Sequence, residues 1–275
     1  MATPADVIPG LILVTGPVLF AHLFNWGLFG VLSVQVYLYY IAFPSDHRGL
    51  KCVVAAIFLL EVTQTVLLTH DAFRVYASGW GNAIELNSIG LYWLNIPVLS
   101  GFISALTQLF YAWRIRILSR SYYAAGAICT VAIVQGVIEI YDGVICLQAG
   151  SLSKLPQSEA SKVFVVWLAM SCACDVMITG SMFFYLQRAK KAILVKKTSN
   201  LLTRLIALTV ETGLLSCTVQ LTALICFVVA DQTLLYTAPV SVTSKLYSNS
   251  LLTVRVFHVV AFGFILTDAG LYDRY

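Results

Sequence analysis

The feature that most constrains this chain is a series of apolar runs, each about 20 residues or longer, that recurs along its whole length. A helix needs about 20 apolar residues to cross the hydrocarbon core of a bilayer. Hydrophobic residues make up 59% of the 275 residues and charged residues 11%, too few polar side chains for a water-facing surface. We therefore expect an all-α, polytopic membrane protein whose loops are too short to form a second domain.

Six of the runs are clear, and the seventh is ambiguous. The clear runs cover residues 17–43, 50–73, 89–118, 122–147, 163–186 and 205–230. Pro97 interrupts the third run and predicts a kink there. The seventh span is either 246–267, which would bury Arg255 and His258, or 234–254, which would bury Lys245. The sequence thus predicts a bundle of seven transmembrane helices.

The distribution of Lys and Arg predicts the orientation of this bundle. One side collects Arg48, Lys51, Arg114, Arg116, Arg120, Arg188, Lys190, Lys191, Lys196, Lys197 and Arg204. The other side has Arg74, Lys154 and Lys162, with Lys245 as a further candidate. Because basic loops stay in the cytoplasm, the N-terminus is expected outside and the C-terminus inside. The net charge of +4 then reflects topology and anionic lipid, so we expect membrane lipid and no nucleic acid as partner.

This topology divides the chain into three parts. Residues 1–16 would form an extracytoplasmic N-terminal segment, 17–254 the seven-helix transmembrane domain, and 255–275 a short interfacial or cytoplasmic C-terminal segment. The membrane would be the plasma membrane or an endomembrane.

Several polar residues fall inside the predicted spans, where each is costly and so a functional candidate. The candidates for lining a ligand cavity are Glu61, Gln64, Asp71, Gln135, Glu139, Asp175, Lys245 and Asn249. Their helix faces must turn inward, and we expect them to meet in a polar cavity in the outer half of the bundle. The alternative is that such residues only form hydrogen bonds between helices. We place Glu61, Asp175 and Lys245 at the polar centre and expect no metal site or cofactor.

Specific strings resemble a known family. They are NWGLFGVLSVQVYLYY (25–40), LLTHDAFR (67–74), QLFYAWRIRILSRS (108–121), RLIALTVETG (204–213) and KLYSNSLL (245–252). The chain resembles, over residues 17–255, a seven-helix membrane family of mushroom-forming fungi that is catalogued as a domain of unknown function. The resemblance implies a last span over 234–254 and a polar cytoplasmic tail. After residue 255 this sequence departs from that pattern with VFHVVAFGFILTDAGLYDRY.

Three functions fit these observations. The first is a heptahelical, receptor-like sensor of a small lipophilic or polar ligand. The alternative is a membrane enzyme acting on a terpenoid-like substrate, with Glu61, Glu139 and Asp175 as candidate proton donors because apolar burial favours the neutral acid. The third is a small-solute transporter, which should show internal repeats or broken helices at matching positions. We expect the sensor and leave the enzyme open.

Overall fold

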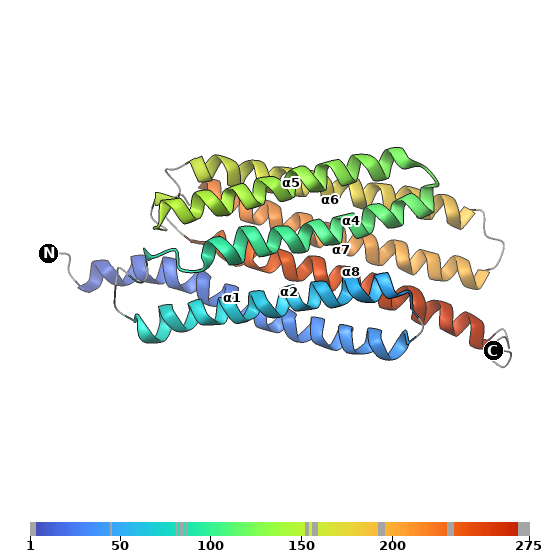
Figure 1. The fold of residues 1–275 in the computed structure, drawn as a ribbon, viewed down its shortest axis with the longest axis horizontal. Coiled ribbons are helices and arrows are strands. Elements are labelled where there is room, and N and C mark those ends of the chain that lie inside the picture. Colours follow the sequence, from blue (N-terminus) through green and yellow to red (C-terminus); the bar gives the residue numbers. More distant parts are fainter. Residues whose placement is uncertain are drawn as a thin grey trace.

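The computed structural model describes residues 4–44, 46–80, 82, 85, 87–151, 154–155, 159–191, 196–229 and 234–268. Side chains are described within 15–191, 202–229 and 234–254 of these ranges. Seven long helices run alternately up and down in this part of the chain (Figure 1). They are α1 (Pro4–Ala42), α2 (Arg48–Phe73), α4 (Ser100–Ser119), α5 (Tyr122–Ala149), α6 (Glu159–Lys191), α7 (Lys196–Val229) and α8 (Thr237–Asp268). A π-helical turn, η1 (Arg74–Ser78), extends α2, and another, η2 (Leu94–Leu99), precedes α4 and contains Pro97.

Six of these helices are long and apolar enough to cross a membrane. The spans are Thr15–Ala42, Arg48–Ser78, Leu94–Ser119, Tyr122–Ala149, Glu159–Lys191 and Leu202–Val229, which match the six runs expected from the sequence. The all-α prediction is thereby confirmed for the described residues. Helix α8 is the seventh. It runs without interruption from Thr237 to Asp268, so it includes all of the candidate span 246–267 and all but the first three residues of 234–254.

The distribution of polar and apolar side chains is that of a protein in lipid. Large apolar residues such as Phe20, Val137 and Ile225 are more than half exposed on the outside of the bundle. Polar and charged residues such as Glu61 and Lys245 are completely buried inside it. A soluble bundle would show the reverse arrangement, since water would solvate its outer surface. Lipid contact therefore explains the apolar exterior.

The helices form a closed bundle that is completed by α8. Along the chain, α1 packs on α2, α4 on α5, α5 on α6, and α6 on α7. Helix α8 then closes the ring by packing against both α7 and α1, and it also contacts α2 and α4. The last helix thus contacts four other helices, and its polar side chains can form hydrogen bonds to them.

Because successive helices run in opposite directions, the loops alternate between the two ends of the bundle (Figure 1). We call the end where α1 begins the N-terminal end, and the end where α4 and α6 finish the basic end, because Arg116 and Lys190 lie in their last turns. At the N-terminal end, the loops after α2 and α5 meet through a bridge between Ser88 and Ser151.

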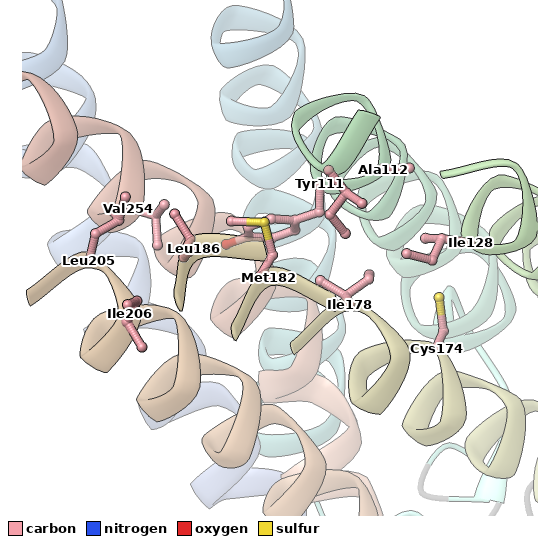
Figure 2. Packing of buried hydrophobic residues seen from close by; sticks show 11 residues of the cluster. Tyr111, Ala112, Ile128, Cys174, Ile178, Met182, Leu186, Leu205, Ile206 and Val254 are labelled. Atoms are coloured by element: carbon pink, nitrogen blue, oxygen red, sulfur yellow. The ribbon is translucent and has the colours of Figure 1, made fainter. Parts of the chain in front are cut away.

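An apolar core fills the bundle towards the basic end. Figure 2 shows part of it, with Tyr111, Ile128, Met182, Leu205 and Val254 contributed by α4, α5, α6, α7 and α8. Each is nearly or completely buried, so five helices share one packed contact region. Dispersion contacts of this kind, rather than a hydrophobic driving force, stabilise helix association within lipid.

Close packing of α6 on α7 depends on a glycine. A Cβ added at Gly213 would lie 3.0 Å from the Thr179 Cβ and closer still to its hydroxyl. Small residues let transmembrane backbones approach in this way. The position therefore sets the spacing of two helices that carry polar residues of the interior.

Candidate functional site

A buried ion pair joins α2 to α8. The Lys245 ammonium donates a hydrogen bond to the Glu61 carboxylate and another, 3.2 Å long, to the Glu61 carbonyl oxygen. Both side chains are 0% exposed. Opposite charges attract strongly in a medium of low dielectric constant, but both have lost their hydration. Such a pair persists only where further polar groups satisfy it.

Those further groups come from the same two helices and from α1. Ser248, three residues after Lys245 on α8, donates to Glu61 Oε1 at 2.5 Å. The ammonium also lies 5.5 Å from the centre of the Phe29 ring, a cation–π contact. Asn249 donates to the Leu28 carbonyl oxygen at 3.2 Å and so ties this part of α8 to α1.

Gln64 extends this cluster from α1, α2 and α8 to η2 and α4. Its side-chain oxygen accepts a hydrogen bond from Ser244 at 2.9 Å. Its side-chain nitrogen donates to the Asn95 carbonyl oxygen at 2.9 Å and to Ser100 at 3.0 Å. Since Asn95 lies in η2, the network connects the ion pair to the π-helical turn around Pro97. Helices α2, α4 and α8 are thus joined through one buried amide.

A cavity of about 80 Å³ lies at the N-terminal end, adjacent to this network. Its walls come from α1, α2, η1, the segment that precedes η2, η2 itself and the first turns of α8. Most of the lining is apolar, and His22, Asp71 and Arg74 supply ionisable groups. Leu68 and Ser241 also line it, and each lies about one helical turn from Gln64 or Lys245.

Arg74 organises the polar side of this cavity. Its guanidinium pairs with Asp71 at 3.5 Å and with Glu85 at 3.1 Å, and it also bonds to Ser88. Asp71 in turn accepts a hydrogen bond from the Leu91 backbone N–H at 3.1 Å. These contacts attach the loop after η1 to the end of α2, so one arginine and one carboxylate shape the cavity wall.

Asp175 belongs to a separate cluster between α6, α7 and α8. Tyr247 donates to its carboxylate at 2.8 Å, and Gln220 donates to the same oxygen at 3.1 Å. Gln220 also donates to the Tyr247 hydroxyl at 2.7 Å, and Ser171 bonds to that hydroxyl at 3.0 Å. Asp175 and Tyr247 line a small cavity of about 20 Å³. Lys245 and Tyr247 therefore project from α8 into different clusters.

A third cluster of buried polar residues lies on the face of α5 that packs against α4 and α6. Ser104 donates to one oxygen of Glu139 at 3.1 Å, and Gln108 donates to Gln135 at 3.2 Å. The indole of Trp167 lies near Glu139 without satisfactory hydrogen-bond geometry. Among the described side chains, the second oxygen of Glu139 and one oxygen of Asp142 have no hydrogen-bond partner. Buried polar atoms without a partner are uncommon in protein interiors, so these two carboxyl groups are notable.

The structure thus distributes the eight candidate residues over several groups. Glu61, Gln64, Lys245 and Asn249 lie together, Gln135 and Glu139 lie on the α5 face, Asp175 lies with Tyr247, and Asp71 lines the cavity at the N-terminal end. Asp71 therefore lines the cavity at the N-terminal end, whereas Glu61 and Lys245 form the buried ion pair and Asp175 accepts a hydrogen bond from Tyr247.

Sequence reasoning did not single out Ser248, Tyr247 or Arg74 as site residues. Ser248 is three residues from Lys245, which puts both on one face of a helix, so helical spacing could have found it. Arg74 is three residues from Asp71 and could have been found by the same criterion. Tyr247 carries no signal of this kind, because its partners Asp175 and Gln220 are distant in the sequence.

A family of unknown function (DUF6534) matches residues 171–254, from the middle of α6 into α8. No curated protein and no solved structure matches the chain. Over this part of the sequence the predicted resemblance to a family of unknown function is confirmed. The matched segment includes Asp175, Gln220, Lys245 and Tyr247, whereas Glu61 lies outside it. Together with six potential spans, the match supports an integral membrane protein of unknown function.

The ion pair makes a direct prediction for stability. Lys245→Met should lower the free energy of unfolding by about 3–5 kcal/mol, because it leaves the Glu61 carboxylate buried without a counter-charge. Adding Glu61→Gln should recover most of this loss. Thermal unfolding of the purified single and double variants in detergent measures both effects. A Lys245→Met protein as stable as the unchanged chain would contradict the buried pair.

Proposed function

We propose that this protein is a heptahelical sensor that binds a small ligand in the cavity at the N-terminal end, called the outer cavity below because we propose that this end faces the outside. One observation carries the proposal: the cavity and the buried ion pair lie on the same faces of α2 and α8. Ser241 of the cavity wall is about one turn from Lys245, and Leu68 is about two turns from Glu61. Ligand pockets are typically concave and mostly apolar, with a few polar groups that orient the ligand. Here His22, Asp71 and Arg74 provide those groups.

The size and lining of the cavity define the ligand class. A volume of about 80 Å³ has room for only a few non-hydrogen atoms in this conformation. Apolar walls, including Val18, Leu68 and Ile89, favour a compact apolar molecule, and the ionisable groups favour one polar substituent. A small, mainly apolar molecule with a single hydroxyl or carbonyl group meets both conditions.

The neighbouring helices offer a route by which binding could change the bundle. Ile96 lines the cavity, and the adjacent Asn95 accepts a hydrogen bond from Gln64. Both residues lie in η2, and π-helical turns are rare features that occur frequently at functional sites. A ligand that moves η2 or the start of α8 would alter the surroundings of the Glu61–Lys245 pair. Binding would then shift the population of two arrangements of α8.

We further propose that α8 is the seventh span and that the N-terminus lies outside. Three observations support this orientation: six potential spans precede α8, α1 begins and α8 finishes at opposite ends of the bundle (Figure 1), and Lys and Arg concentrate at the basic end. The transmembrane domain would then extend to residue 254, with Lys245 inside the membrane. The fungal seven-helix family suggested by the sequence remains part of this proposal.

Antibody access to terminal tags tests the orientation. In intact cells, an antibody should label a tag on the N-terminus, and it should reach a tag on the C-terminus only after permeabilisation. An untagged chain and a cytoplasmic marker protein control for leakage. Labelling of both tags in intact cells would contradict seven spans, and labelling of the C-terminal tag alone would reverse the orientation.

Thermal stabilisation by small molecules tests the sensor. The probe is a panel of compact apolar molecules that each carry one hydroxyl or carbonyl group. A ligand at 100 times its Kd should stabilise the purified protein by about 2.7 kcal/mol. Ala21→Phe should abolish this stabilisation, because Ala21 lines the cavity. Gly27→Phe on the same helix should not, because Gly27 has open space around its Cβ position.

Two outcomes would contradict the proposal. If no member of the panel stabilised the protein, the ligand class would be wrong. If Ala21→Phe and Gly27→Phe retained the same stabilisation, the molecule would bind elsewhere, and the outer cavity would lose its assigned role.

An enzyme is the second candidate, favoured by the surroundings of Asp142. This residue lines a cavity of about 20 Å³ together with Tyr92, Phe164, Phe227 and Tyr236. One carboxyl oxygen of Asp142 has no hydrogen-bond partner among the described side chains. A carboxylic acid beside aromatic rings could protonate an alkene or epoxide, while the ring faces stabilise the resulting cation. The cavity would have to enlarge to admit a terpenoid-like substrate.

Mass spectrometry of lipophilic metabolites distinguishes the enzyme from the sensor. Host cells that make the unchanged chain are compared with cells that make Asp142→Asn. Cells making Glu159→Gln serve as the matched control, because Glu159 lies on an exposed helix start. A metabolite that disappears only with Asp142→Asn would establish the enzyme and overturn the sensor. Identical profiles would count against the enzyme.

A further inference from the structure

A larger cavity lies at the basic end of the bundle, opposite the proposed ligand site. It has a volume of about 250 Å³ and lies between the end of α4, the end of α6 and the beginning of α7. Leu186 of α6 and Leu205 of α7, both drawn in Figure 2, contribute to its walls. Of the described residues that line it, all except Arg114 are apolar.

One face of α4 supplies both the apolar wall and the charge. Phe110, Trp113, Arg114 and Ile117 follow the spacing of a single helix face and all line the cavity. Phe110 is buried, whereas Trp113 is 46% and Ile117 59% exposed, so the wall continues onto the outside of the bundle. An occupant could therefore reach the cavity from the surrounding lipid.

The chain around this cavity is strongly basic. The segments 108–121 and 186–210, which include the lining residues, contain no Asp or Glu. They carry the basic residues Arg114, Arg116, Arg120, Arg188, Lys190, Lys191, Lys196, Lys197 and Arg204. Lys190 is four residues after Leu186 and so lies on the same side of α6, just beyond the cavity. The positive charge of these residues attracts an anion and would repel a cation.

We infer that this cavity binds an anionic phospholipid. One acyl chain occupies the apolar space between α4, α6 and α7, and the phosphate group meets Arg114 at the mouth. A guanidinium is suited to this contact because its N–H groups match the geometry of phosphate oxygens. Basic pockets between transmembrane helices are known sites for anionic lipid headgroups. A soluble anion would leave the apolar walls without a partner.

Native mass spectrometry of the full chain in detergent tests the inference. Phosphatidic acid and phosphatidylcholine with identical acyl chains are the probes. The unchanged protein should bind phosphatidic acid in preference to phosphatidylcholine. Arg114→Gln should weaken binding of phosphatidic acid by about fivefold, the effect of removing one basic residue from an anionic lipid contact. Equal binding of the two lipids would overturn the inference.

A matched control separates this site from general surface charge. Arg116 is two residues away on α4, and its guanidinium lies 4.5 Å from the centre of the Tyr122 ring, outside the residues that line the cavity. Arg116→Gln removes the same charge and should leave phosphatidic acid binding unchanged. Equal losses in Arg114→Gln and Arg116→Gln would show that only the summed charge matters and would overturn the site.

A third variant tests the apolar half of the site. Leu202→Trp should reduce phosphatidic acid binding by filling the cavity without changing its charge. Glycerol 3-phosphate, which has the headgroup but no acyl chain, should not compete with phosphatidic acid. Competition by glycerol 3-phosphate, or full binding by Leu202→Trp, would overturn the inference. Unchanged melting temperatures in lipid-free detergent verify that each variant is folded.

Discussion

The Glu61–Lys245 ion pair is the interaction on which the interior of this bundle depends. Lipid on the outside can solvate neither charge, so both must face inward and find each other. Their supporting contacts recruit Ser248 on α8 and Phe29 on α1, and Gln64 continues the network to η2. The relative positions of α1, α2, α4 and α8 are therefore coupled to one pair of charges. Hydrophobic association cannot supply this specificity, because lipid tails are as apolar as the helices.

The two cavities lie on opposite sides of this central network and differ in chemistry. The outer cavity has ionisable groups of both signs, with Arg74 held by Asp71 and Glu85. The basic-end cavity has a single arginine and an apolar lining among its described residues. Helix α4 and the η2 turn before it reach both, since Ile96 lines the first and Phe110 the second. A ligand at one end and a lipid at the other would therefore act on the same span.

Much of the architecture could be predicted from the sequence, and less of the site. The six spans follow from apolar runs of the required length, a property of local composition that needs no knowledge of contacts. Glu61 and Lys245 could be selected singly because charges inside a span are costly. Their pairing could not, because it joins residues 184 positions apart. From the sequence, Asp175 was an equally reasonable partner for Lys245, but in the structure its carboxylate accepts hydrogen bonds from Tyr247 and Gln220 instead.

By itself, the sequence determined that the chain is helical, that it is suited to a bilayer, and which residues are too polar to face lipid. These properties depend on the period of one helix and on the free energy of transferring single side chains from water. Only the tertiary structure decided that α8 closes the bundle beside both α1 and α7, and that Lys245 meets Glu61 while Tyr247 meets Asp175. Tertiary structure also placed a cavity at each end. The physical reason is that helix rotation and neighbour choice depend on packing between distant segments, which no local pattern encodes.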